Sequence, residues 1–185
     1  MLVARGRAIV TTREPGGTPL GDLLRAAFVE PGVILTPLTE AFVVNASRAQ
    51  LIDDVIEPAL ARGAWVLCDR YVDATFAYQG FGRGLAYDTL RTLVDTATRG
   101  RLPDLTFLVD VPVEVSRSRV ASRAEAAHVA IDRLEREDTA FHERVRAGYL
   151  ELAREDARIV TLDGTLAPDV LCETATAIVA AKFGA

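Results

Sequence analysis

The sequence predicts a single α/β domain built on a doubly wound parallel sheet with flanking helices. Two observations predict this class. Short apolar runs alternate along the chain with longer stretches of helical pattern, an order that implies right-handed crossovers between parallel strands. The second to fourth runs are continuous rather than alternating, as expected of strands that are covered on both faces. In such sheets ligands bind beyond the carboxyl ends of the strands, so the loops that follow the strands are the places to search for a site.

The expected elements follow one another without a repeat or a linker, so residues 1–185 are expected to form one domain. The strands are expected at residues 7–12, 65–69, 105–111 and 158–163. The helices are expected at residues 20–29, 38–62, 87–99, 113–123, 132–153 and 168–183. Residues 124–131 are small and featureless, as in a mobile flap, and the whole flap is expected at about residues 117–134.

Composition narrows the class of protein. Half of the 185 residues are hydrophobic and a quarter are charged, which is ordinary for a globular chain that buries one core. The net charge of −5 argues against sequence-independent binding of nucleic acid, which needs clustered cations. Apolar runs of membrane-spanning length are missing, and Cys68 and Cys172 lack metal-ligand spacing. The expected protein is cytoplasmic, with no nucleic-acid or membrane partner.

Unusual residues follow the first strand, in the loop Arg13-Glu14-Pro15-Gly16-Gly17-Thr18. The two glycines permit positive φ or a close approach of the backbone to a ligand, and the proline stiffens the entry. A plain turn explains the loop equally well when it is considered alone.

Asp69-Arg70-Tyr71 ends the second strand. A strand-terminal Asp can hold a metal-bound water, and a planar Arg can grip phosphate oxygens with two parallel hydrogen bonds. The alternative is a structural ion pair. The following stretch, Tyr78-Gln79-Gly80-Phe81-Gly82-Arg83-Gly84, is expected to make a poor helix but a good wall for a base.

Isolated arginines give two further candidate sites. Arg48 lies within an otherwise apolar helix, where it either pairs with a carboxylate or, less commonly, reads a base. Arg117, Arg119 and Arg123 follow the third strand, where cations on a flap could close over transferring phosphates. A solvated helix face with ion pairs is the competing interpretation, and it is strongest for Arg117.

Taken together and in order, these motifs resemble those of bacterial thymidylate kinases over essentially the whole chain. The matching segments are Thr12-Arg13-Glu14-Pro15-Gly16-Gly17-Thr18, Ser47-Arg48-Ala49-Gln50, Asp69-Arg70-Tyr71 through Tyr78-Gln79-Gly80, Gly82-Arg83-Gly84-Leu85, Pro103-Asp104-Leu105, Asp110-Val111-Pro112, Asp132-Arg133-Leu134-Glu135, and Phe141-His142-Glu143-Arg144-Val145-Arg146 through Tyr149-Leu150. Each segment is a weak signal, but their common order and spacing make the resemblance specific.

The resemblance implies a nucleoside monophosphate kinase fold and transfer of the ATP γ-phosphoryl group to dTMP, with Mg²⁺. It implies that Arg70 holds the acceptor phosphate and that Asp69 orders the magnesium shell through water. Arg123, with Arg119, is expected to act from the flap on the transferred group. The family commonly forms homodimers, for which the helices at residues 38–62 and 87–99 are the candidates.

The remaining site residues are also implied by the resemblance. Arg48 is expected to hydrogen-bond the thymine, with Tyr78 and Gln79 near the base or sugar. The loop residues Arg13, Glu14, Pro15 and Gly16 are expected to face the acceptor phosphate. The turn Asp163-Gly164-Thr165 is expected to lie near the adenine.

The sequence departs from the family pattern in two ways. Val44 stands where the family usually offers an aromatic residue to stack on thymine, and Phe42 lies off that face. The family also begins with a strand, a Gly-x-x-x-x-Gly-Lys-[Ser/Thr] loop and a helix. That motif occurs nowhere in these 185 residues, whose only lysine is Lys182, and residues 1–6 read as the tail of that helix.

We therefore expect a shortened chain without the first strand, the phosphate loop and the first helix. Such a chain should show little or no phosphoryl transfer. Its sheet should have either a gap or a closed-up register between the strands at residues 65–69 and 105–111. Two other functions stay open: a catalytically inactive nucleotide-binding or dimer-partner protein, and a kinase for another nucleoside monophosphate.

Overall fold

The computed structural model describes residues 8–184, which contain four parallel strands. These are β1 (Ile9–Arg13), β2 (Trp65–Asp69), β3 (Thr106–Asp110) and β4 (Ile159–Asp163). β1 pairs with β2 in the register Ile9 to Trp65, and β3 pairs with β4 in the register Thr106 to Ile159. The expected strands are thus confirmed to within two residues. The helix tail expected at residues 1–6 lies outside the described residues.

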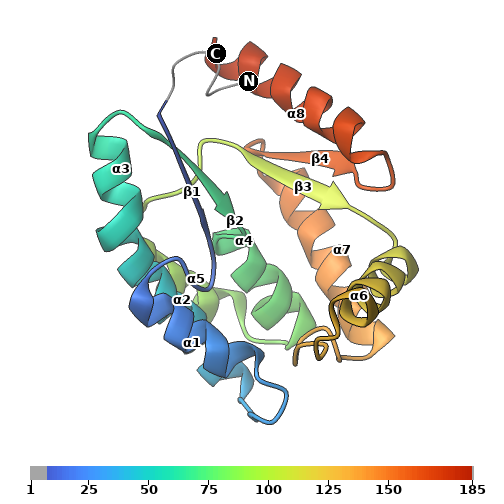
Figure 1. Ribbon diagram of the computed structural model, residues 1–185. Coiled ribbons are helices and arrows are strands. Elements are labelled where there is room, and N and C mark those ends of the chain that lie inside the picture. The colour runs from blue at the N-terminus through green and yellow to red at the C-terminus, as the bar shows by residue number, and fades with distance from the viewer. Residues whose placement is uncertain (1–7, 185) are drawn as a thin grey trace.

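The strands form two separate two-stranded sheets rather than one continuous sheet. In Figure 1, β1 and β2 lie on one side of the molecule, and β3 and β4 lie on the other. Between them is a cavity of about 1410 Å³ that is lined by both β2 and β3. Leu67 on β2 and Val109 on β3 are consequently about half exposed. The gap expected at this place is confirmed within residues 8–184.

Helices connect and surround the strands, and Pro or a capping side chain begins most of the long ones. Their bounds are α1 (Pro19–Val29), α2 (Pro37–Leu51), η2 (Ile52–Ile56), α3 (Glu57–Ala61), α4 (Val72–Thr75), η3 (Phe76–Gly82), α5 (Tyr87–Thr98), α6 (Val113–Ala127), α7 (Thr139–Glu155) and α8 (Pro168–Phe183). The segments η2 and η3 are π-helical. Within the described part of the chain, no helix is both long and apolar enough to cross a membrane.

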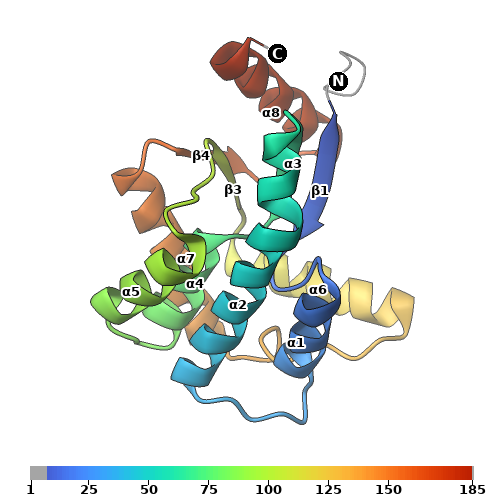
Figure 2. The ribbon, with the colours of Figure 1, turned by 90° about the vertical axis from the view of Figure 1, so that its left-hand side faces the viewer.

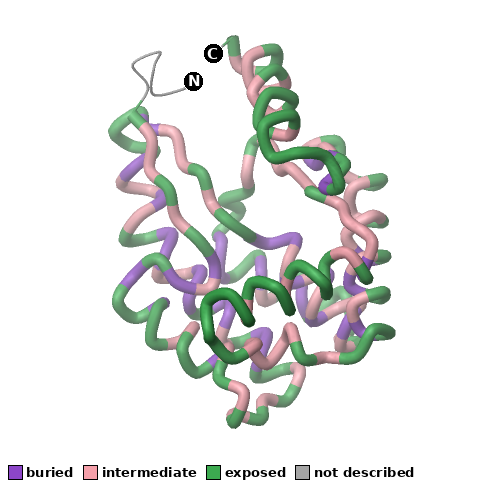
Figure 3. The backbone as a smooth tube through the Cα atoms, turned by 45° about the vertical axis from the view of Figure 1, so that its right-hand side comes forward, coloured by how far each residue is buried: buried purple, intermediate pink, exposed green. Residues whose placement is uncertain are grey.

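Burial is concentrated around the helices beneath the strands, as the purple stretches of the tube show (Figure 3). One buried cluster joins α2 and η2 to the end of β2 and to α5, and includes Leu51, Ile52, Tyr71 and Val94. A second cluster joins η3 to α7 through Ala77, Phe141 and Val145. By contrast, α8 has no buried residue among those described. The core therefore supports the carboxyl ends of the strands, where ligands of parallel sheets bind.

Three of the expected helices differ in the structure. The helix expected at residues 38–62 contains a π-helical turn, although α2 and α3 still run end to end (Figure 2). The helix expected at residues 132–153 begins only at Thr139, because the Asp138 carboxylate caps it by accepting a hydrogen bond from the Phe141 amide. Residues 124–127, expected in the flap, instead extend α6, which ends at the left-handed His128.

The expectation of a poor helix at residues 78–84 was wrong, because η3 covers residues 76–82. Gly82 of η3 and Gly148 of α7 permit close packing between these two helices. A Cβ added at Gly82 would lie 2.7 Å from the Phe141 ring, and one added at Gly148 would lie 2.5 Å from the Phe81 side chain. The close helix contact that these glycines permit outweighs their unfavourable helix propensity.

Candidate functional site

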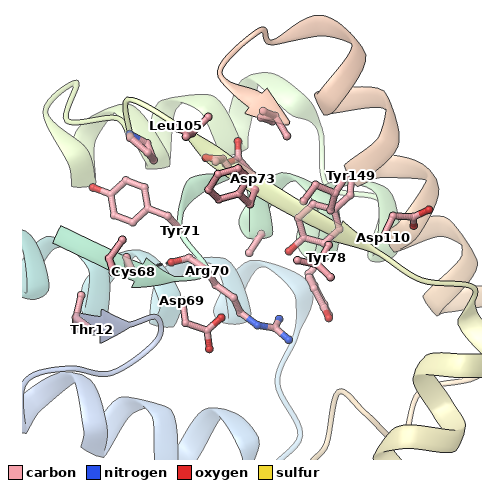
Figure 4. A pocket seen from close by; sticks show the side chains of 18 of the residues that line it. Thr12, Cys68, Asp69, Arg70, Tyr71, Asp73, Tyr78, Leu105, Asp110 and Tyr149 are labelled. Carbon is pink, nitrogen blue, oxygen red and sulfur yellow. Dashed lines mark hydrogen bonds between the residues drawn. The ribbon is translucent and has the colours of Figure 1, made fainter. Parts of the chain in front are cut away.

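Arg70 is the residue that follows the end of β2, and it has the backbone angle φ 66°. The left-handed region is strained for a residue with a side chain, and such strain is concentrated at functional sites. Its guanidinium lies over the Tyr78 ring, 5.1 Å from the ring centroid, and points from the strand end toward η3 (Figure 4). Interaction with Tyr78 raises the pKa of Arg70, so the side chain stays cationic. Its recorded partner in the described chain is an aromatic ring rather than a carboxylate.

The predicted acceptor-site residues come together around a second, small cavity of about 30 Å³. Predicted residues that line it are Glu14, Pro15, Arg48, Arg70, Tyr78 and Gln79. This volume holds water but is small beside ordinary ligand pockets, which measure roughly 300–1,000 Å³. A nucleotide therefore needs the cavity walls to move apart.

Arg48 is 1% exposed, and side chains from three segments fix its guanidinium. Its Nε donates to the Glu14 carboxylate at 2.8 Å, its Nη1 to Asn45 Oδ1 at 2.8 Å, and its Nη2 to Thr75 Oγ1 at 3.0 Å. Burial nevertheless raises the pKa of Glu14, and this effect outweighs the lowering by Arg48. Of the two interpretations of Arg48, the pair with a carboxylate is present in the structure, and the hydrogen bond to thymine stays a prediction.

The loop after β1 packs against α2 through its backbone. Gly16, with φ 129°, donates its amide hydrogen to Ser47 Oγ at 2.9 Å. Arg25 donates to the Pro15 carbonyl at 3.1 Å. Arg13 forms an exposed ion pair with Asp22 at 3.5 Å. Pro15 and Glu14 thus line the small cavity, whereas Arg13 and Gly16 lie outside its lining.

The residues expected near the donor lie on β4 and α6. Asp163 accepts hydrogen bonds from the amide and hydroxyl of Thr165, which lower the pKa of Asp163. Arg119 donates to the Gly164 carbonyl at 3.0 Å, so it contacts this turn directly. Arg123 pairs with Glu135 and lines neither cavity.

Asp69 is exposed at the end of β2, beside Arg70. In residues 8–184 no group of three acidic, His or Cys side chains could hold a metal ion. A single exposed carboxylate is still compatible with Mg²⁺, which commonly binds through one or two carboxylates together with substrate phosphates. The donor set around Asp69 is thus compatible with a magnesium ion that the substrate helps to hold.

Several lining residues were missed from the sequence: Phe28, Ala74, Thr75 and Leu134 also line the small cavity. Phe28 carried no signal, because an apolar residue at the end of a helix is ordinary core. Glu40, which is fully buried, was also missed. Glu40 could have been found by the criterion that singled out Arg48, namely a charged residue within an otherwise apolar helix.

Comparison with known proteins shows the family of the chain. The family model described as "Thymidylate kinase" matches residues 1–173. A thymidylate kinase of Deinococcus radiodurans is 47% identical over 92% of this chain and 81% of its own length. Those of Thermomicrobium roseum and Geotalea daltonii are 49% and 43% identical, over 94% and 99% of this chain and 81% and 86% of their own lengths. These matches support neither a shortened chain nor the alternative functions considered above. The chain belongs to the thymidylate kinase family.

Proposed function

We propose, against the expectation of little or no transfer that was drawn from the missing glycine-lysine motif, that the chain transfers the γ-phosphoryl group of ATP to dTMP. The acceptor binds between Arg70, Arg48 and Gln79 in this proposal. The observation that carries this proposal is the position of Arg70. Its backbone has a positive φ, and its side chain is a cation at a strand end that lines the cavity also lined by the other predicted acceptor residues. A cation at this place binds a phosphate dianion.

The acceptor phosphate is itself the nucleophile, and it needs no strong base near neutral pH. Catalysis then depends on position and on neutralisation of charged oxygens. Arg70 holds the acceptor phosphate in this proposal. The Arg70 guanidinium packs on the face of the Tyr78 ring, 5.1 Å from the ring centroid, and this contact limits rotation of the guanidinium.

The thymine and sugar occupy the space that opens when the walls of the small cavity move apart. Gln79 and Arg48 supply polar contacts there, and Tyr78 lies near the sugar. Phe28 lines the same cavity as Val44, so Phe28 supplies the aromatic surface that Val44 lacks. The loop residues Glu14 and Pro15 close the side toward β1.

On the donor side, the Asp163–Thr165 turn binds near the adenine, and Arg119 steadies that turn through the Gly164 carbonyl. Arg123 exchanges its partner Glu135 for a phosphate oxygen when the flap closes. Asp69 holds water of a magnesium shell, and that ion supplies charge neutralisation on the phosphates when it is bound.

The test combines dTMP binding, measured by isothermal titration calorimetry, with dTDP formation from dTMP and ATP, measured by chromatography. Binding of dTMP that Arg70→Ala removes, together with dTDP formation by the wild-type chain, supports the proposal. Failure to bind dTMP overturns the acceptor site. Binding without dTDP formation overturns the transfer activity and leaves the acceptor site in place.

A homodimer through α2 is part of the proposal. Leu38 and Phe42 are four residues apart on one face of α2, and they are 41% and 53% exposed. Phe42→Asp should convert a dimer to a monomer in light scattering coupled to gel filtration, whereas a wild-type monomer would contradict the proposal. The proposed compartment is the cytoplasm, in keeping with the free thiols of Cys68 and Cys172.

A further inference from the structure

Glu40 lies in the first turn of α2 and is 0% exposed. Its carboxylate accepts hydrogen bonds from three side chains. Oε2 accepts from Gln79 Nε2 at 3.1 Å and from Arg83 Nε at 3.2 Å. Oε1 accepts from Arg83 Nη2 at 2.9 Å and from Arg133 Nη1 at 2.6 Å. A buried carboxylate with this many donors is a fixed point of the structure, because moving it would leave several charges unpaired.

The contact with Gln79 decides which way its amide faces. A Gln amide has a donor end and an acceptor end of nearly the same shape, so rotation by half a turn exchanges them. The Glu40 carboxylate only accepts hydrogen bonds, so the NH₂ group of Gln79 must face it. The carbonyl oxygen of Gln79 therefore lies on the other side of the amide carbon. Because Gln79 lines the small cavity and is itself 2% exposed, that acceptor is the end left for a ligand.

The contact with Arg133 connects the flap to the same Glu40 carboxylate. The Arg133 backbone amide donates to the Val29 carbonyl at 3.0 Å, its Nε donates to the Phe28 carbonyl at 3.1 Å, and its guanidinium lies 5.2 Å from the Phe28 ring centroid. The next residue, Leu134, lines the small cavity together with Phe28. One carboxylate thus contacts both the wall of the base site and the segment that covers it.

We propose that Glu40 is a positioning residue for base selection: its buried carboxylate fixes Gln79 with the carbonyl oxygen toward the base, while Arg133 holds the covering flap on the same carboxylate. This inference rests on the proposed acceptor site. Thymine presents an N3–H donor to such an acceptor. Cytosine presents an unprotonated N3 acceptor at the same place, which a fixed Gln79 carbonyl repels and a rotated Gln79 amide would bind.

The experiment measures the dissociation constants of dTMP and dCMP by isothermal titration calorimetry, which needs no turnover. Two variants alter the anchor. Glu40→Gln keeps the shape but no longer restricts the partner to a donor, and Glu40→Asp keeps the charge but withdraws the carboxylate by one methylene. Each should lower the preference for dTMP over dCMP by about tenfold or more, the usual effect of losing a hydrogen bond to a charged group. Circular dichroism shows whether each variant is folded.

Two further variants separate positioning from general support. Glu137 is the other carboxylate partner of Arg83, at 2.6 Å, and within residues 8–184 it makes no hydrogen bond with Gln79. Glu137→Gln should therefore leave the preference for dTMP over dCMP unchanged. In a Gln79→Ala background, changing Glu40 should no longer alter the preference, because the group through which it acts is gone.

A wild-type chain that fails to bind dTMP would refute the proposed acceptor site. A wild-type chain that binds dTMP, with folded Glu40 variants of unchanged preference, would refute the role of Glu40 alone. Equal losses of dTMP and dCMP affinity in the Glu40 variants would also refute it, because they would show support of the fold without base selection.

Discussion

Arg48 and Glu14 form an ion pair that is almost completely removed from water. The Arg48 Nη2 and Glu14 Oε2 atoms lie 2.8 Å apart, and the two side chains are 2% and 3% exposed. The pair joins the loop after β1 to the middle of α2, two segments that are 34 residues apart in the sequence. It therefore positions the predicted acceptor loop against the helix that carries the proposed base site.

Breaking this pair should be costly, whereas removing both charges should not. Arg48→Met leaves the Glu14 carboxylate buried without its cation and should lower the free energy of unfolding by about 3 kcal/mol or more. The double variant Glu14→Gln with Arg48→Met should recover most of this loss. Urea unfolding measures both values. Arg91→Met, which removes an exposed pair with Asp95, is the matched control and should change stability by less than about 0.5 kcal/mol.

Two substitutions of Arg70 should lower activity equally but differ in their effect on stability. Arg70→Ala should lower kcat/KM by about 10³- to 10⁵-fold, because an arginine that acts on a transferring phosphoryl group contributes this much. Arg70→Gly should be equally inactive but more stable than Arg70→Ala by about 1 kcal/mol, because glycine adopts φ 66° without strain. A coupled assay and urea unfolding measure the two effects. Near-normal activity of Arg70→Ala would remove Arg70 from the site.

The strands and several residues of the small cavity were predictable because their signals are local. Continuous apolar runs marked the strands, and Arg70 was conspicuous as a cation at a strand end. The parallel-sheet rule then placed residues from separate loops at one edge, and the structure confirms that Pro15, Arg48 and Gln79 line one cavity.

What escaped prediction depends on contacts between distant segments. The helical form of η3 could not be inferred from its composition, because the direct packing of Phe141 of α7 on Gly82 offsets the unfavourable helix propensity of glycine there. Glu40 and Phe28 likewise acquire their positions from Arg133, 93 residues away from Glu40 in the chain. Sequence periodicity contains no information on such partners.

Gly148 should tolerate no larger residue, because α7 contacts Phe81 there. An added Cβ would lie 2.5 Å from both the Cγ and Cδ2 atoms of Phe81, and 2.8 Å from its Cβ, which cannot move without the backbone. Gly148→Ala should therefore lower the free energy of unfolding by about 1–3 kcal/mol. Phe81→Leu in the same chain should recover part of this loss. Thermal and urea unfolding measure both, and a Gly148→Ala chain of wild-type stability would contradict the packing.

The ion pair between Asp110 and Arg146 should make the stability of the fold depend on pH in the acid range. Arg146 donates two hydrogen bonds to the Asp110 carboxylate, at 2.7 and 2.9 Å, and they lower the pKa of Asp110 below its ordinary value of 3.8. Because the folded state holds the proton less tightly than the unfolded state, the pair stabilises the fold fully above pH 3.8. This contribution is lost as the pH falls through the lowered pKa.

Asp110→Asn should thus be less stable than the wild type at pH 7 by about 1 kcal/mol, a value kept small because both side chains are partly exposed. The difference should narrow as the pH falls below the ordinary Asp value of 3.8, where the wild-type carboxylate also becomes neutral. Urea unfolding at a series of pH values measures it. Asp95→Asn, at the exposed pair with Arg91, should show no such dependence. A constant difference for Asp110→Asn across the series would mean that packing, rather than charge, stabilises the fold at this position.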